Sequence, residues 1–179
     1  MGLTQTKRIY ATIIYQKGMV SAMNKNIRVF LAIKNQEERS RMEDTLVLDG
    51  FEVSTFQSAG QMWDAYRTHA ARIVISERRF GKDLSGLALT RNIRKDFLLP
   101  YCYIVLLSTM NRIKEIEEGL AAGADDYLIR PHNPFQLRSR ILVGLRWLSY
   151  IDSLNTKEQA MGKQPAAVQP SPDQASGSL

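Results

Sequence analysis

The chain has a single cysteine, Cys102, among its 179 residues, and only two histidines. One cysteine cannot form an internal disulfide, and no CxxC motif or Cys/His cluster is present that could hold zinc. At this length, a composition of 44% hydrophobic residues can supply the core of one domain without either device. The scarcity of cysteine therefore indicates a reducing, cytoplasmic setting.

The sequence also lacks a long hydrophobic run. Near the N-terminus the longest run extends only from Ile9 to Tyr15, whereas a helix needs about 20 apolar residues to cross a bilayer. The same run is a poor signal-peptide core, so we expect no membrane span and no membrane partner. The net charge of +6, from 24 basic and 18 acidic residues, contains no block of like charge. It allows an anionic partner without requiring one.

The two ends of the chain differ in composition from its middle. Residues 1–26 show no sustained hydrophobic period, and three of the six prolines fall between Thr156 and Leu179 among Gln, Ser, Ala and Gly. Such a composition buries too little apolar surface to offset the entropy lost on ordering. We predict a poorly ordered N-terminal extension over 1–26, a folded domain over 27–150 and a disordered tail over 151–179.

The middle of the chain alternates short β-type runs with longer stretches of helical period. Two of the runs, VFLAI and YIVLLS, are apolar on both faces, as is typical of central strands covered by helices. The alternation predicts a doubly wound α/β fold with five parallel strands in one sheet, of flavodoxin-like (βα)5 type. The predicted strands are 28–33, 51–56, 73–76, 103–108 and 126–129, and the predicted helices are 37–50, 58–69, 84–97, 111–123 and 133–148.

In such a fold the functional crevice lies beyond the carboxyl ends of the strands. The residues expected there are Ile33 and Lys34 after the first strand, Glu77 after the third, Ser108 at the end of the fourth and Arg130 after the fifth. Taken singly, each polar residue has an ordinary explanation as a solvated loop residue. Polar residues at four corresponding strand ends are harder to explain in that way, so this edge of the sheet is the predicted site.

The stretch GLAAGADDYLIRPHNPFQL, with YIVLLS before it and LDGFEV earlier in the chain, resembles the response-regulator receiver domain. That domain is the phosphoacceptor module of two-component signalling, and the similarity covers residues 27–147. The resemblance implies that Glu77 stands where the family has its phosphoaccepting Asp, and that Arg130 replaces the Lys that contacts the phosphate. It also implies that Ser108 is the switch hydroxyl and Tyr127 the switch aromatic residue.

The same resemblance places Ile33 and Lys34 at the positions where the family has two acids that bind Mg²⁺. Phosphoryl transfer to a carboxylate needs a divalent cation to neutralise charge and to align the reactants. Ile33 supplies no ligand, and an ammonium at Lys34 would repel a cation while attracting Glu77. We therefore expect no Mg²⁺ and no other cofactor.

The charges predict what fills the pocket instead. Glu is one methylene longer than Asp, so the Glu77 carboxylate would reach toward the usual place of the phosphate, where Arg130 can receive it in bidentate fashion. We predict a Glu77–Lys34–Arg130 network that holds the domain in one conformation. The alternative is a decayed pocket in which Glu77 and Arg130 are exposed and uncoupled.

Output is expected to run through protein contacts, because the 32 residues after 147 are too few for an output domain. We interpret the chain as a stand-alone pseudo-receiver, a phosphorylation-independent adaptor in bacterial signalling. Its expected partner is a histidine kinase or a downstream effector, with a homodimer as a further candidate. The resemblance implies docking through the fourth helix, fifth strand and fifth helix, a region that includes Ile113, Ile116, Tyr127, His132, Arg138, Arg140 and Arg146.

Three other functions are less well supported. A working phosphoacceptor on Glu77 would lack its metal. An enzyme of flavodoxin-like fold would need a glycine-rich, phosphate-binding loop after the first strand, and the segment AIKNQEE has no glycine. His69 and His132 also lie at no recognisable spacing from a nucleophile or a metal ligand. For nucleic-acid binding, the sequence contains no helix-turn-helix and no RNA-reading motif. The arginines that suggest this function are explained equally well as residues on solvated helix faces; they are Arg78, Arg79, Arg138, Arg140 and Arg146.

Overall fold

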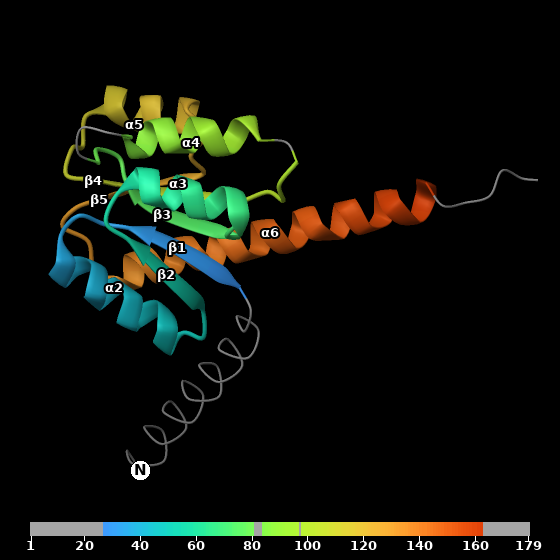
Figure 1. Ribbon diagram of the computed structural model, residues 1–179, viewed down its shortest axis with the longest axis horizontal. Helices are drawn as coiled ribbons and strands as arrows, with labels where there is room; N and C mark the ends of the chain where they lie inside the picture. The colour runs from blue at the N-terminus through green and yellow to red at the C-terminus, as the bar shows by residue number, and fades with distance from the viewer. Residues whose placement is uncertain (1–26, 81–83, 97, 163–179) are drawn as a thin grey trace, which may run out of the picture.

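The computed structural model describes residues 27–80, 84–96 and 98–162, and shows a sheet between two layers of helices (Figure 1). The predicted extension over 1–26 lies outside the described residues. The strands are β1 (Arg28–Ala32), β2 (Glu52–Phe56), β3 (Ile73–Glu77), β4 (Tyr103–Ser108) and β5 (Asp126–Ile129). The helices are α2 (Gln36–Leu48), α3 (Ala59–Thr68), α4 (Gly86–Lys95), α5 (Ile113–Ala121) and α6 (Pro134–Gly162).

The five strands form one parallel sheet in the order β2-β1-β3-β4-β5. The doubly wound, flavodoxin-like prediction is therefore confirmed. The strand order changes direction between β1 and β3, which pair with Leu31 opposite Ile75. Their carboxyl ends consequently open into the crevice where folds of this type bind their ligands.

The sheet separates two hydrophobic cores. Helices α2 and α6 cover one face, and α3, α4 and α5 cover the other (Figure 1). Every residue of β4 is buried, as the apolar run YIVLLS predicts for a strand covered on both faces. On helix α3, Met62 and Tyr66 are buried in the core, while Trp63 is partly buried and packs against it.

Side-chain caps begin four of the described helices; at the start of α6, Asn133 Oδ1 accepts a hydrogen bond from the Gln136 backbone N–H at 2.9 Å. Asn35, Ser58 and Ser85 each accept a hydrogen bond from the backbone N–H three positions on, at 2.9, 3.1 and 3.1 Å. Two glycines with left-handed backbone follow the ends of α2 and α5, at Gly50 (φ 92°) and Gly123 (φ 102°). The cap at Asn35 matters most for function, because it fixes where α2 starts above the end of β1.

Helix α6 is longer than the sequence pattern predicts. It was expected to end at Leu148, with a disordered tail over 151–179, but it continues through Gly162. The rest of the predicted tail, 163–179, lies outside the described residues. No glycine or proline occurs between 145 and 161, so nothing in that stretch breaks a helix. An ion pair between Arg72 and Asp152, at 2.8 Å, also holds the helix beyond Leu148. None of the helices within the described ranges is long and apolar enough to span a membrane.

Candidate functional site

The residues predicted for the site meet at the carboxyl edge of the sheet. Glu77 ends β3, and Arg130 follows β5 and donates its backbone N–H to the carbonyl of Ser108 at the end of β4 (2.7 Å). A cavity of about 480 Å³ lies at this edge, and its lining includes Lys34, Glu77, Ser108 and Arg130. Four strand ends thus contribute to one place, as the doubly wound topology requires.

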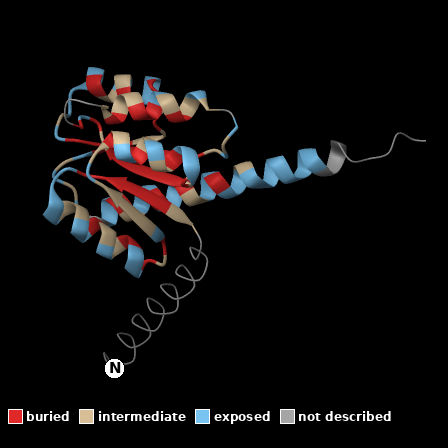
Figure 2. Ribbon diagram, in the orientation of Figure 1, coloured by how far each residue is buried: buried red, intermediate tan, exposed pale blue. Residues whose placement is uncertain are grey.

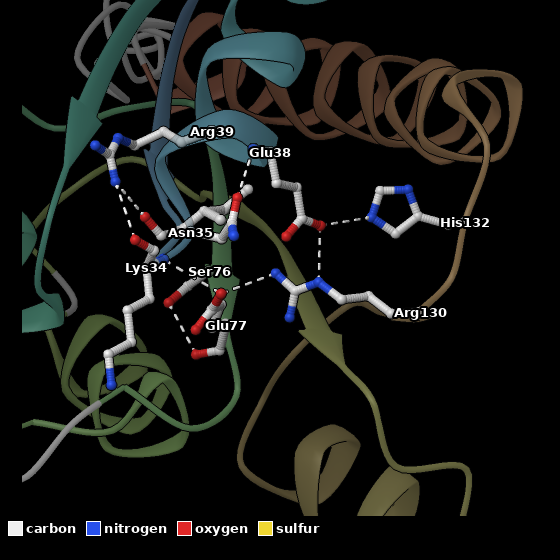
Figure 3. A network of polar contacts seen from close by, with 9 residues as sticks. Lys34, Asn35, Glu38, Arg39, Ser76, Glu77, Arg130 and His132 are labelled. Atoms are coloured by element: carbon white, nitrogen blue, oxygen red, sulfur yellow. Dashed lines mark hydrogen bonds and ion pairs between the residues drawn. The ribbon is translucent and has the colours of Figure 1, made fainter.

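The centre of the site is an ion pair between Glu77 and Arg130 (Figure 3). Arg130 Nη2 lies 2.9 Å from Glu77 Oε1, and the two side chains are only 18% and 12% exposed. The predicted bidentate contact is wrong, because Arg130 turns its Nε to a second carboxylate, Glu38 Oε1, at 2.7 Å. The guanidinium therefore bridges β3 and the first turn of α2. A planar group with several fixed donors suits this role.

The prediction for Lys34 is right about the place and wrong about the chemical group. The backbone N–H of Lys34 donates to Glu77 Oε1 at 3.2 Å. Its ammonium points away from the carboxylate, and the residue is exposed (Figure 3). A lysine at a strand end can keep its charge in water, whereas its amide is fixed by the backbone. The network around Glu77 thus contains one side-chain cation, Arg130, and not two.

The donor groups at this edge do not fit a magnesium ion. Mg²⁺ requires an octahedral set of oxygen ligands. Ile33 is fully buried and offers no oxygen, and Oε1 of Glu77 already accepts hydrogen bonds from Arg130 and from the Lys34 amide. Within the described part of the chain, no three His, Cys, Asp or Glu residues are grouped so that they could hold a metal ion.

Glu38 and His132 belong to the site, although sequence reasoning missed the first and misplaced the second. His132 was expected on the docking face, but its Nε2 lies 3.4 Å from Glu38 Oε1 in the same cluster as Arg130. Burial lowers the pKa of His132; the charge of Glu38 acts in the opposite direction, and that of Arg130 lowers the pKa further. The only sequence signal for Glu38 was its place in the first turn of a helix, which dipole arguments explain equally well.

A second set of ion pairs connects the residues after Glu77 to α5. Arg78 is buried, and its Nη2 lies 2.5 Å from Glu118 Oε2. Arg79 Nη2 lies 3.1 Å from Glu115 Oε1. These arginines, considered above for nucleic acid, instead pair with carboxylates of the chain itself. The segment that carries Glu77 is therefore attached to one of the helices of the predicted docking face.

Ser108 and Tyr127 lie close to the network without joining it. The Ser108 hydroxyl accepts a hydrogen bond from the Met110 amide at 3.1 Å. The Tyr127 ring is buried against α5, so close that a Cβ on Gly119 would lie 3.1 Å from it. Their switch roles, implied by the resemblance, stay predictions. Neither side chain has a described contact with Glu77 or Arg130.

The remaining arginines of the predicted docking face point to different neighbours. Arg140 pairs with Asp126 at the start of β5, at 3.3 Å, and so lies on that face. Arg138 donates from Nε to Asp49 Oδ2 at 2.7 Å, and therefore faces α2. Ile113 is exposed at the start of α5. Arg138 and His132 therefore do not belong to the surface formed by α5, β5 and α6. That this surface docks a partner stays a prediction.

A family model described as "Response regulator receiver domain" matches residues 29–142. Protein PetR from Rhodobacter capsulatus is 35% identical over 127 residues, covering 65% of this chain and 48% of that protein. "Probable transcriptional regulator ycf27" from Cyanidium caldarium is 32% identical over 108 residues, covering 60% and 42%. The chain therefore spans less than half the length of these curated relatives.

A solved structure shows the same fold. The two-component response regulator from Clostridium difficile superposes with a TM-score of 0.62 at 21% identity. The match covers 68% of this chain and 97% of that structure. At this identity the likeness bears on architecture alone, and it agrees with the sheet order and helical layers described above.

Proposed function

Because the chain belongs to the family of response-regulator receiver domains, we propose that it acts in two-component signalling as a pseudo-receiver that binds its partners without being phosphorylated. The observation that carries the proposal is the contact between Glu77 and Arg130, 2.9 Å apart in a largely buried pocket. In the family, the residue at the position of Arg130 contacts the phosphate of the modified Asp. Here an unmodified carboxylate already lies within reach of that cation.

The surroundings of the pair favour this state. Glu77 also accepts a hydrogen bond from the backbone N–H of Lys34, and Arg130 forms a second ion pair with Glu38 through its Nε. An incoming phosphoryl group would have to displace these contacts and then place more negative charge beside Glu38. With no oxygen ligand at Ile33 to help hold a divalent cation, nothing would offset that repulsion. We therefore propose that Mg²⁺ does not bind and that Glu77 takes up no phosphoryl group.

The output surface in this proposal is the face formed by α5, β5 and α6. The carboxylates of Glu115 and Glu118 attach α5 to Arg78 and Arg79, the two residues after Glu77. This arrangement supports a pocket that fixes the position of α5 permanently, where a regulated receiver would move it. Receiver domains act through histidine kinases, phosphotransfer proteins and effectors, so the proposed partner is a signalling protein of one of these classes, with self-association as a further use of the surface.

The setting follows from the same features. We propose a cytoplasmic location in a bacterial cell, in keeping with the lone, buried cysteine. Nucleic acid is not a proposed partner of this domain. Four of the five arginines that suggested it form ion pairs within the chain, with Glu118, Glu115, Asp49 and Asp126.

Intact-mass spectrometry after incubation with acetyl phosphate and Mg²⁺ tests the proposal. We expect no gain of about 80 Da, the mass of one phosphoryl group. The matched control is the triple variant Ile33→Asp, Lys34→Asp, Glu77→Asp, which restores the acids that the family resemblance implies and should gain that mass. A stable adduct that maps to Glu77 in the unmodified protein would refute the proposal and establish a working phosphoacceptor.

A further inference from the structure

A second cavity lies beside the Glu77 site, between α2 and the start of α6. Its volume is about 650 Å³, which falls within the range of about 300–1,000 Å³ that is typical of small-molecule sites. Arg130 lines this cavity and also the one that contains Glu77, so the two are neighbours. We call it the α2–α6 cavity; its lining includes Glu37, Glu38, Met42, Thr45, His132 and Leu137.

The α2–α6 cavity has both an apolar and a polar part. Met42 and Leu137 are 6% and 2% exposed and belong to the hydrophobic core beneath α2. Glu37 is exposed in the first turn of the same helix. In Figure 2, α2 carries buried residues toward the sheet and exposed residues toward solvent. The cavity therefore suits a ligand with an apolar body and a polar group at one end.

His132 is a buried polar side chain without a hydrogen bond in the wall of this cavity. Its side chain is 8% exposed, and within the described part of the chain neither ring nitrogen has a hydrogen-bond partner. Burial lowers the pKa of the ring, so it is uncharged near pH 7 and keeps one nitrogen as an acceptor. Buried polar groups are rarely left unpaired in folded proteins. The position is therefore suited to a hydrogen-bond donor supplied by a ligand.

The charges around the cavity favour a cation. Arg130 contacts two carboxylates, those of Glu77 and Glu38, at 2.9 and 2.7 Å, so this cluster has an excess of one negative charge. The other two charged residues of the lining, Glu37 and Arg41, cancel each other. An anion would add to the excess, whereas a monovalent cation would neutralise it.

We propose that the α2–α6 cavity binds a small organic cation, a protonated amine that carries an apolar ring or chain. The apolar part lies against Met42 and Leu137, and the ammonium group donates hydrogen bonds toward His132 and Glu38. Because Glu38 also contacts Arg130, binding is transmitted to the Glu77 network. The cavity does not depend on whether Glu77 is phosphorylated, so this inference goes beyond the proposed function.

NMR titration of the ¹⁵N-labelled full chain with three phenyl compounds of similar shape tests the proposal. Near pH 7 phenethylamine is a cation, 2-phenylethanol is neutral and 3-phenylpropionate is an anion. We expect phenethylamine to cause saturable shifts of the Met42, Thr45 and Leu137 amide resonances at roughly millimolar concentration. 2-Phenylethanol should bind about threefold more weakly, and 3-phenylpropionate about tenfold more weakly, because only the charge differs.

Two variants with matched controls locate the site. Thr45→Phe should fill the cavity and weaken phenethylamine binding about tenfold. Its control is Val47→Phe, which adds the same ring at an exposed position of α2 outside the lining. Glu37→Gln should weaken binding about threefold, and because Glu37 is exposed, the fold should not depend on it. Its control is Glu43→Gln, which removes a charge from α2 outside the lining and should leave binding unchanged.

Three results would overturn the proposal. One is the absence of saturable shifts at these amides with phenethylamine, which would leave the cavity for a protein partner. Another is equal binding of the three phenyl compounds, and the third is binding that persists unchanged in both Thr45→Phe and Glu37→Gln. Intact-mass spectrometry with acetyl phosphate keeps the two proposals apart. A phosphoryl adduct on Glu77 would refute the proposed function, whereas phenethylamine binding would still stand on its own titration.

Discussion

Arg130→Met is the most informative single change in the site. Arg130 lies 2.9 Å from Glu77 and 2.7 Å from Glu38, and all three side chains are largely buried. A hydrogen bond to a charged group contributes about 1.5–3 kcal/mol, and the two carboxylates left behind would also repel each other. Because some solvent reaches the pocket, we expect Arg130→Met to lower the free energy of unfolding by about 2–3 kcal/mol, or to lower the melting temperature by roughly 6–10 °C.

Two further variants separate charge from packing. Glu77→Gln keeps the shape of the side chain and an oxygen that can accept the hydrogen bond from the Lys34 amide. It should therefore lower the free energy of unfolding by less, about 1–1.5 kcal/mol. Glu38→Gln in the Arg130→Met background should recover about 1 kcal/mol, since it removes one of two uncompensated charges. Asp64→Asn is the control. Its ion pair with Arg67 has a length of 3.1 Å but is well exposed, and its loss should cost less than about 0.5 kcal/mol.

Urea unfolding of the single and double variants measures the coupling. If the pair is a true network, Glu77→Gln and Arg130→Met should together differ from the sum of the single effects by about 1–2 kcal/mol. Additivity within about 0.4 kcal/mol, with no recovery by Glu38→Gln, would refute the reasoning. The site would then be a decayed pocket whose charges do not depend on one another.

Three other outcomes follow from the structure. Burial lowers the pKa of His132 below its ordinary 6.5, so the unfolded chain binds more protons than the folded one as the pH falls. Urea titrations from about pH 7.5 to 5.5 should therefore show that the free energy of unfolding decreases below about pH 6.5. The variant His132→Gln should abolish this decrease. Arg78→Met should cost about 1.5–2 kcal/mol and speed hydrogen exchange in α5, because it removes a buried guanidinium that pairs with Glu118 at 2.5 Å and faces the buried Glu115 carboxylate at 3.9 Å. The exposed Arg79→Met should cost under about 1 kcal/mol. Gly144→Ala should lower the melting temperature, since the added Cβ would lie 2.5 Å from the ring of Tyr103. Gly60→Ala, at a helix position where the added Cβ meets no close neighbour, should raise the free energy of unfolding by roughly 0.5–1 kcal/mol.

The sheet could be predicted closely because hydrophobic period and strand propensity act locally. Two predicted strands, Tyr103–Ser108 and Asp126–Ile129, match the structure at both ends, and Gly50 and Gly123 marked helix ends correctly. The end of α6 was misjudged because a polar composition is shared by disordered tails and by exposed helices. Only the absence of helix-breaking residues before Gly162 distinguishes the two.

The site was predicted in outline because strand ends converge in a doubly wound sheet whatever their side chains do. Its contacts could not be predicted to the same degree. Whether Lys34 uses its amide or its ammonium depends on backbone geometry at one residue. Whether Arg130 bridges to Glu38 depends on where the Asn35 cap starts α2 relative to β5. The contact between Arg130 and Glu38 joins residues 92 positions apart in the chain, beyond the reach of any local pattern.

The backbone amide resonances of ¹⁵N-labelled protein, recorded as Mg²⁺ and then beryllofluoride are added, test the central claim most directly. Beryllofluoride mimics an acyl phosphate and needs the metal and a free carboxylate at the same time. If Glu77 is held by Arg130 and the Lys34 amide, the resonances of these three residues should stay where they are at millimolar additions of both reagents. Saturable shifts of the Lys34 and Glu77 amides, spreading to α5, would contradict the account and show a pocket that still responds to phosphorylation.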